Sequence, residues 1–292
     1  MSPFYSIVIN VLDGENYLAR LFSSIASQNF YDYEIILIDN CSSDATESIV
    51  KSYSSKFPLF TIHRTTSTVP LYSARNIAVQ LASGKYIAFH DVDDLWSFDK
   101  LSSYYALLCN EKYDIAFGSY NVIKHRANIT RKQEFKYKNS LIVLNDDVFK
   151  AYNIAMSSLV ISRKSFANGL FNPKYLIIGE FEYILRMFYQ KRALVVLRRT
   201  CTVLQDDNST SVKYPHQFSR ELYSLSFDYI NNRKIYKYLF SNSIYKLYQS
   251  YFLSKPSYRL AFFLMIRLFI KYKFPLLSFR FLLVSTILLL KA

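Results

Sequence analysis

Short apolar runs alternate with segments of helical spacing through the first 120 residues, and this alternation constrains the fold more than any other feature. Strands are expected at residues 5–12, 33–40, 59–64 and 85–91, and helices between them at residues 15–28, 43–53 and 73–84. We expect Ser43 or Asp44 to cap the second helix and Gly84 to end the third. Strands that alternate with helices imply right-handed crossovers, so the sequence predicts an α/β fold with a mainly parallel central sheet flanked by helices.

The pattern is less regular beyond residue 114. Strands are expected at residues 114–123 and 194–204, a hairpin or loop at 124–139, and a strand that leads into a helix at 155–166. Asp39 and Asp91 stand at the carboxyl ends of two of the early strands. Ligands of open α/β sheets bind beyond these ends, so both residues are candidates for a binding site.

The overall composition is that of a globular chain with a sizeable core. The 292 residues are 51% hydrophobic and 17% aromatic, which suits one large domain or a domain with an appendage. The three cysteines are an odd number without a CxxC pair, so we expect a reducing compartment and neither a disulfide framework nor a zinc site. No basic segment precedes the apolar run at residues 5–12, which we interpret as a first strand and not a signal peptide.

Positive charge is concentrated at the C-terminal end. Residues 213–292 contribute +11 of the net charge of +14, with Glu221 and Asp228 as their only acidic residues. We therefore predict two parts, a domain at residues 1–212 and a basic, aromatic, helical extension at 213–292. Such charge suits nucleic acid or an anionic membrane. Tyr and Phe alternate here with Leu and Ile, which favours lipid, so a membrane surface is expected and nucleic acid is not.

The extension is not expected to cross a bilayer. Its longest uncharged stretch, residues 281–290, is shorter than the roughly 20 residues that a spanning helix needs. Two alternatives remain for the extension: an interfacial membrane segment, or a helical subdomain packed on the first domain.

Three carboxylates crowd into the segment "FHDVDDLW", where Asp91, Asp93 and Asp94 follow an apolar run. Like charges at this spacing repel, so the cluster is solvated, caps a helix or binds a cation. Two carboxylates separated by one residue can hold Mg²⁺ or Mn²⁺ and leave positions open for a diphosphate. A divalent ion there would stabilise a diphosphate leaving group.

This acidic segment and four further motifs follow one another along the chain in the order "LDGENYL", "IDNCSSD", "ARN", "DVDD" with a following Trp, and "GEFEYILR". Together they resemble the family-2 glycosyltransferases of the GT-A fold, a nucleotide-sugar-binding α/β architecture, over about residues 4–211. The resemblance implies a metal-dependent inverting transfer, with Mn²⁺ or Mg²⁺ as cofactor. The donor would be a nucleotide sugar, in the first place a UDP-sugar. The acceptor would be a glycan or lipid-linked glycan in cell-surface polysaccharide synthesis. The enzyme would be cytoplasmic and peripheral at the inner face of the cell membrane.

The resemblance also implies roles for the donor-side residues. Asp39 matches the position that hydrogen-bonds the nucleobase, although an Asp in a turn or at a helix cap would look the same. Asp91 matches the position near the ribose and diphosphate, and Asp93 matches the metal ligand, with Asp91 as a second ligand. Arg75 lies in the segment that approaches the nucleotide; a salt bridge to Asp39 or Asp91 is its alternative role.

The residues expected to act on the acceptor lie mainly in the motif "GEFEYILR". Glu180 matches the catalytic base of the family, with Glu in place of the usual Asp, and Glu182 follows two residues later. Either could instead be an acid that stabilises a helix N-terminus. Asp94 and Trp96 are expected to be structural or on the acceptor side: Asp94 as a cap for a helix at residues 98–108, and Trp96 as a packing anchor or a wall of the acceptor site.

One departure from the family pattern and two alternative functions stand beside this interpretation. The segment around Asp206 lacks the His that many family members carry in a loop over the diphosphate. A sugar-nucleotidyltransferase would need a glycine-rich loop after the first strand, where this chain has only Gly14. A non-catalytic membrane- or nucleic-acid-binding protein that retains the fold is the other alternative.

Overall fold

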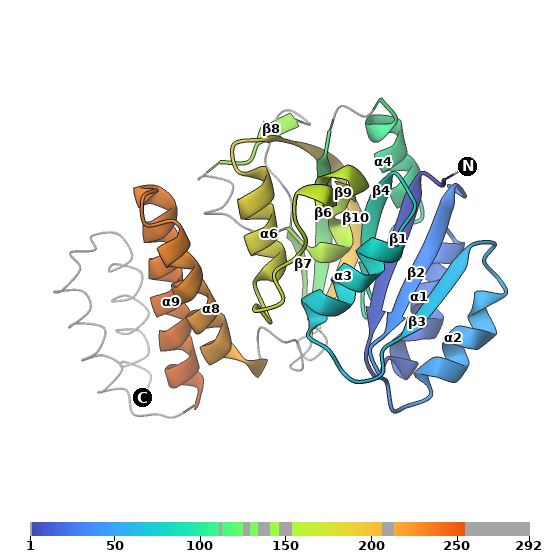
Figure 1. The fold of residues 1–292 in the computed structure, drawn as a ribbon, viewed down its shortest axis with the longest axis horizontal. Coiled ribbons are helices and arrows are strands. Elements are labelled where there is room, and N and C mark those ends of the chain that lie inside the picture. The colour runs from blue at the N-terminus through green and yellow to red at the C-terminus, as the bar shows by residue number, and fades with distance from the viewer. Residues whose placement is uncertain are drawn as a thin grey trace. The chain divides into compact units, whose positions relative to one another are not determined.

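The computed structural model describes residues 2–110, 113–124, 129–133, 141–145, 154–205 and 213–254 (Figure 1). The chain divides into two compact units, Met1–Ser209 and Thr210–Ala292, which are described separately. Among the predicted features, the loop around Asp206, residues 125–128 and 134–139 of the expected hairpin or loop, and residues 281–290 lie outside the described residues.

Unit 1 opens with the predicted alternation of strands and helices. Its first elements are β1 (Tyr5–Val11), α1 (Glu15–Ala26), β2 (Tyr33–Asp39), α2 (Thr46–Ser54), β3 (Phe60–Arg64), α3 (Leu71–Leu81) and β4 (Tyr86–Asp91). The four strands pair in parallel in the order β3-β2-β1-β4. The prediction of an α/β fold is confirmed, and the carboxyl ends of β2 and β4 meet at one edge of the sheet.

The sheet is mixed beyond β4. The remaining elements of unit 1 are β5 (Leu95–Trp96), α4 (Lys100–Leu108), β6 (Ile115–Lys124), β7 (Ile129–Gln133), β8 (Leu141–Val143), η1 (Met156–Ser158), β9 (Val160–Ser162), η2 (Arg163–Asn168), α6 (Gly179–Phe188) and β10 (Arg192–Gln205). Strand β9 runs antiparallel to both β4 and β6, whereas β10 is parallel to β6. Strand β7 pairs antiparallel with β6, so of the two alternatives predicted for residues 124–139, a hairpin or a loop, the described residues form a hairpin strand.

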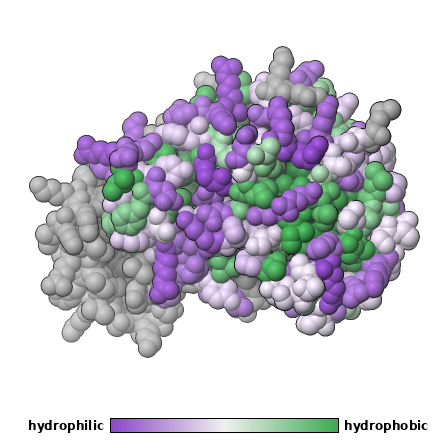
Figure 2. Space-filling view, viewed as in Figure 1, coloured by the Kyte–Doolittle hydropathy of each residue, from purple (hydrophilic) through white to green (hydrophobic). Residues whose placement is uncertain are grey.

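The two faces of the parallel strands bury different layers. Side chains alternate between the faces of a strand. One face of β1 and the apolar face of α1 belong to the same core. The buried apolar residues that these two elements contribute to it are Tyr5, Ile7, Ile9, Val11, Leu18, Leu21, Phe22 and Ile25. Each large apolar side chain stabilises the fold by about 1.5–3 kcal/mol when fully buried. Asn10 and its register neighbour Asp91 point to the other face, which α3 covers. Figure 2 shows apolar surface over α3 and β2, bordered by polar side chains.

Two predicted helix boundaries are wrong. Helix α3 ends at Leu81, with Ala82 in extended conformation, so Gly84 is not its C-terminal cap. Gly84 instead lies against β1, where a Cβ atom would come within 2.6 Å of the Ser6 backbone nitrogen. Helix α2 begins after Ala45, although the predicted cap Asp44 does accept a hydrogen bond from the Thr46 backbone. The position of Gly84 is explained by its packing against β1, and the spacing of apolar residues along the sequence does not indicate such a contact.

Unit 2 contains two packed helices, α8 (Pro215–Asp228) and α9 (Arg233–Ser254). The Ser219 hydroxyl donates to the Ser243 carbonyl oxygen across the pair at 2.8 Å. Leu222, Leu225, Ile235, Leu239 and Phe240 are buried. Among the residues that the structure describes, no helix has the length and apolar character needed to cross a membrane.

Candidate active site

Arg75 lies at the centre of a charged cluster at the carboxyl end of β4. This arginine of α3 is buried, and its Nη2 atom lies 2.8 Å from Oδ1 of Asp91, the last residue of β4. Burial alone would lower the pKa of Arg75, but Asp91 together with Tyr72 and Glu180 raises it above its usual value. The Asp91 side chain is 39% exposed. Of the two salt bridges predicted as alternatives for Arg75, the structure forms the one with Asp91.

Glu180 joins the same cluster from the first turn of α6. Its Oε2 atom accepts a hydrogen bond from the Tyr72 hydroxyl and lies 3.7 Å from Nη1 of Arg75. Burial raises the pKa of Glu180, while Arg75 and Tyr72 act in the opposite direction. We call Tyr72, Arg75, Asp91 and Glu180 the Arg75 cluster. In this cluster the Arg75 guanidinium group lies between Asp91, expected to contact the donor, and Glu180, expected to be the base.

Asn10 lies beside this cluster and was not expected from the sequence. It is the register neighbour of Asp91 on β1. Both polar atoms of its side chain are buried without a hydrogen-bond partner among the described residues. An unpaired buried amide costs about 1–3 kcal/mol, so folding does not explain its presence at this edge.

Asp39 forms a second charged group at the end of β2. Its side chain is 2% exposed, accepts a hydrogen bond from the Ser42 backbone at 2.9 Å and pairs with Nη1 of Arg64 at 2.9 Å. Arg64 ends the neighbouring strand β3 and also pairs with Glu47 of α2 at 2.7 Å. Arg64 was not predicted from the sequence, although its position at the end of the expected third strand was a signal for it.

Asp93 and Asp94 differ in exposure. Asp94 is buried and accepts a hydrogen bond from the Leu204 backbone at 3.1 Å. Burial raises its pKa well above the usual value, and the neighbouring Asp91 and Asp93 add to this effect. Asp94 does not cap α4, whose N-cap is Asp99, so that prediction is wrong. Asp93 is half-buried, like Asp91.

Trp96 packs in the core, as the structural alternative for this residue predicts. Its ring is buried and stacks on His90, with 4.3 Å between ring centroids. Its Nε1 atom donates to the Ser157 carbonyl oxygen at 3.0 Å, and Nζ of Lys100 lies 3.9 Å from its ring centroid. The Ser157 hydroxyl in turn accepts a hydrogen bond from the Asp91 backbone at 3.0 Å. Ser157 thus supports the end of β4, a role that the sequence did not indicate.

Glu182 lies apart from the Arg75 cluster. Its buried carboxylate pairs with Nε of Arg186, one turn later in α6, at 2.5 Å. Residues two apart on a helix point in nearly opposite directions, so Glu180 and Glu182 cannot face the same site. The structural alternative therefore fits Glu182.

The residues at the end of β4 fit a divalent cation bound together with a diphosphate. Within the described part of the chain, no group of three or more His, Cys, Asp or Glu side chains is arranged to hold a metal. Asp91 and Asp93 nevertheless offer two half-exposed carboxylates separated by one residue. Mg²⁺ commonly binds through one or two carboxylates and takes its other ligands from substrate phosphates and water.

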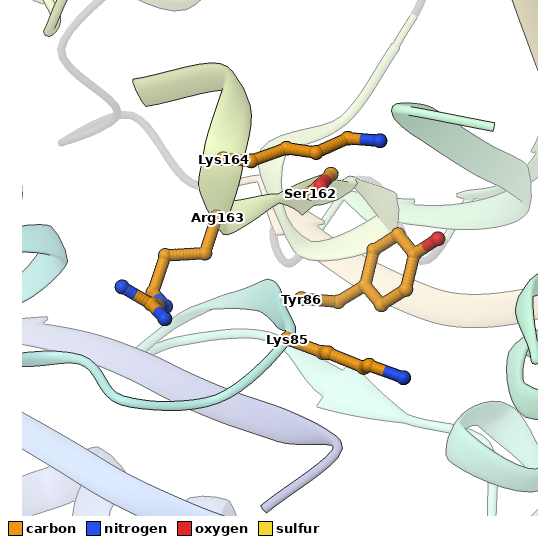
Figure 3. Close-up of a pocket in the computed structure, with 5 residues that line it drawn as sticks. All are labelled: Lys85, Tyr86, Ser162, Arg163 and Lys164. Atoms are coloured by element: carbon orange, nitrogen blue, oxygen red, sulfur yellow. The ribbon is translucent and has the colours of Figure 1, made fainter. Parts of the chain in front are cut away.

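A cavity of about 240 Å³ lies at the other end of β4, lined by Lys85, Tyr86, Ser162, Arg163 and Lys164. Figure 3 shows the Tyr86 ring between the amino groups of Lys85 and Lys164, with Arg163 pointing away from them. Strand β4 begins at Tyr86 and ends at Asp91, so roughly 15 Å of strand separates this cavity from the Arg75 cluster. The cavity is therefore not part of the candidate site.

Comparison with solved structures identifies the architecture. Staphylococcus aureus TarS, solved in complex with UDP-GlcNAc, superposes with a TM-score of 0.69 over 83% of this chain and 72% of that one, at 17% identity. The mannosyltransferase PcManGT from Pyrobaculum calidifontis, in complex with GDP-Man and Mn²⁺, superposes with a TM-score of 0.59 over 94% of this chain and 82% of that one, at 14% identity. The fold is therefore the GT-A fold of glycosyltransferases.

Sequence comparison identifies the family. The model for glycosyl transferase family 2 matches residues 6–171, and the chain belongs to this family. The Escherichia coli UDP-Glc:alpha-D-GlcNAc-diphosphoundecaprenol beta-1,3-glucosyltransferase WfgD is 29% identical over 123 residues, which are 42% of this chain. The match spans 47% of the length of that relative.

Proposed function

We propose that this protein transfers a sugar from a UDP-sugar to a glycan or lipid-linked glycan acceptor in the synthesis of a bacterial surface polysaccharide. The observation that carries the proposal is the Arg75 cluster, in which one guanidinium group contacts Asp91 on the donor side and lies 3.7 Å from Glu180. The names of the relatives support the substrate classes: WfgD uses a UDP-sugar and a diphosphoundecaprenol acceptor, and TarS binds UDP-GlcNAc.

The donor would lie across the carboxyl ends of β2, β1 and β4. Asp39 is a buried carboxylate at this edge and would accept a hydrogen bond from the nucleobase. Arg75 would neutralise part of the diphosphate charge, beside Asp91 near the ribose. Asp91 and Asp93 would hold Mn²⁺ or Mg²⁺, which supplies positive charge to the departing diphosphate when it is bound.

Glu180 would act as the general base. The acceptor hydroxyl attacks the anomeric carbon on the side opposite to the diphosphate, and Glu180 takes the proton as the new bond forms. The bond between the anomeric carbon and the diphosphate oxygen breaks in the same step, so the configuration inverts. Burial raises the pKa of Glu180 towards the working pH, which suits a group that must accept a proton.

Replacement of the base is the decisive experiment. We expect Glu180→Gln to lower kcat at least ~10²-fold with donor affinity nearly unchanged, because the amide keeps the shape but cannot accept the proton. Glu182→Gln in the same helix is the matched control and should have a milder effect. Release of UDP in steady-state assays gives kcat, and NMR of the product gives the anomeric configuration. A retained configuration, or an essential Glu182 beside a dispensable Glu180, contradicts the mechanism.

The basic extension would place the enzyme at the inner face of the cell membrane as a peripheral protein. Residues 213–292 carry 13 Lys and Arg. Each cation near an anionic surface contributes about 1 kcal/mol of attraction. A lipid-linked acceptor would be presented at the same surface.

A further inference from the structure

Tyr72 connects helix α3 with the first turn of helix α6. Its side chain is buried, and its hydroxyl donates a hydrogen bond to Oε2 of Glu180. The same hydroxyl lies 3.2 Å from the Ile177 carbonyl oxygen, just before α6 begins. A tyrosine in the first turn of α3 thus reaches the residue that the proposed mechanism uses as a base.

The Tyr72 ring is fixed by its surroundings. A Cβ atom on Gly179 would come within 2.4 Å of the ring, so only glycine at this position lets α6 begin against it. The Phe171 ring packs at 5.8 Å between centroids, and the Arg75 guanidinium lies 5.3 Å from the Tyr72 centroid. A ring held on several sides keeps its hydroxyl in one place, which a flexible donor could not do.

Tyr72 and Arg75 act on the same carboxylate oxygen. They are three residues apart in α3 and therefore share one face of the helix. Oε2 of Glu180 accepts the Tyr72 hydrogen bond and lies 3.7 Å from Nη1 of Arg75, whose Nη2 is bound to Asp91. Without the tyrosine hydroxyl, the carboxylate would keep Arg75 as its partner in this pair and lose the group that holds its Oε2 atom from the other direction.

We propose that Tyr72 is a positioning residue for the general base: its hydroxyl, fixed against Gly179, holds the Glu180 carboxylate in the orientation that receives the acceptor proton. The proposal rests on the proposed function, because it assigns Tyr72 a role through Glu180. Tyr72 itself does not take part in proton transfer.

The test compares Tyr72→Phe with Tyr183→Phe. Phenylalanine keeps the ring against Gly179 and removes only the hydroxyl. Tyr183 of α6 is the matched control, because its buried hydroxyl has no hydrogen-bond partner among the described residues. Glutamate ¹³Cδ signals are followed by NMR through a pH titration, with Glu180→Gln to assign the Glu180 signal. Steady-state assays over the same pH range give kcat and the donor KM.

We expect Tyr72→Phe to raise the pKa of Glu180, because a hydrogen bond donated to the charged form is lost while Arg75 and Asp91 still face the carboxylate. The acidic limb of the kcat profile should move to higher pH by the same amount. We expect kcat at its plateau to fall about 10-fold with an unchanged donor KM. Tyr183→Phe should change none of these quantities.

The outcomes separate this proposal from the proposed function. If Tyr72→Phe changes neither the Glu180 titration nor the kcat profile while Glu180→Gln is inactive, the base is correct and the positioning role of Tyr72 is overturned. If Glu180→Gln transfers sugar normally, the base assignment fails, and the role of Tyr72 fails with it even if the titration moves. A fall in kcat without a shift of the acidic limb indicates a merely structural role and also overturns the proposal.

Discussion

Two acidic residues at the carboxyl ends of the parallel strands each form an ion pair with an arginine. Asp39 is buried and pairs with Arg64, whereas Asp91 is half-exposed and pairs with the buried Arg75. A buried ion pair is weak evidence for stability, because desolvation offsets much of the attraction. Stability alone therefore does not explain these pairs, and the proposed donor-binding role of Asp39, Asp91 and Arg75 supplies a reason for them.

The Asp39 pair gives a first prediction. We expect Asp39→Ala to weaken UDP binding about 10- to 100-fold, because it removes a charge-assisted acceptor from the nucleobase side. Isothermal titration calorimetry with UDP measures the change, and circular dichroism checks the fold. Glu47→Ala is the control, since it removes the other partner of Arg64 without touching Asp39. Unchanged affinity in Asp39→Ala would leave Asp39 with a structural role, in the turn with Ser42 and the ion pair with Arg64.

The Asp93 carboxylate gives a second prediction. We expect Asp93→Ala to abolish transfer, because one of the two proposed metal ligands is lost. EDTA should inactivate the wild-type enzyme, and Mn²⁺ or Mg²⁺ should restore it. Asp99→Ala, which removes a nearby acid paired with Arg198, is the control and should keep its activity. Full activity of Asp93→Ala, or indifference of the wild type to EDTA, would exclude the metal.

Helices and strands were predictable where local pattern alone decides them. The positions of strands β1 to β4 were predicted from apolar runs. The places of Asp39 and Asp91 at the carboxyl ends of two strands were predicted from the ends of those runs. Contacts between distant residues could not be predicted from spacing. Tyr72 meets Glu180 across 108 positions, and Arg64 meets Asp39 across 25. The antiparallel β9 is three residues long, and its direction follows from neighbours on both sides and not from its sequence.

Helix α4 provides a prediction at this scale, because its first residue is a buried lysine. Burial lowers the pKa of Lys100 to about 7, against a usual value near 10.5. Between these values the unfolded chain binds the proton and the folded chain does not. The free energy of unfolding should therefore rise with pH from about 7 to 10.5, by up to about 1.4 kcal/mol per pH unit.

Denaturant unfolding at several pH values measures this slope. We expect Lys100→Met to remove the contribution, since the substituted side chain fills a similar volume without a titrating group. Lys191→Met, at an exposed position, is the control and should leave the slope unchanged. If Lys100→Met also leaves it unchanged, Lys100 titrates normally in the folded protein.

At the scale of the whole molecule, the chain combines a GT-A unit with a basic second unit. The family match covers residues 6–171 and therefore lies wholly in unit 1. Unit 2 contributes most of the net positive charge, and its described helices expose Tyr223, Phe227 and Tyr245, with Ile230 exposed in the turn between them. Basic charge beside exposed aromatic and apolar side chains is typical of segments that bind membrane interfaces.

The last prediction concerns the end of this extension. Residues 256–292 hold six Lys and Arg and no acidic residue. We expect their removal to reduce sedimentation of the protein with anionic liposomes. The difference should shrink as salt rises, because exposed charges are screened beyond a Debye length of about 8–10 Å near physiological ionic strength. The control is Lys85→Gln with Lys164→Gln, which removes positive charge from the cavity in unit 1 and leaves the extension intact. Equal lipid binding by the truncated protein and the wild type would show that residues 256–292 are not the membrane contact. Loss of binding only in the double variant would transfer that role to unit 1.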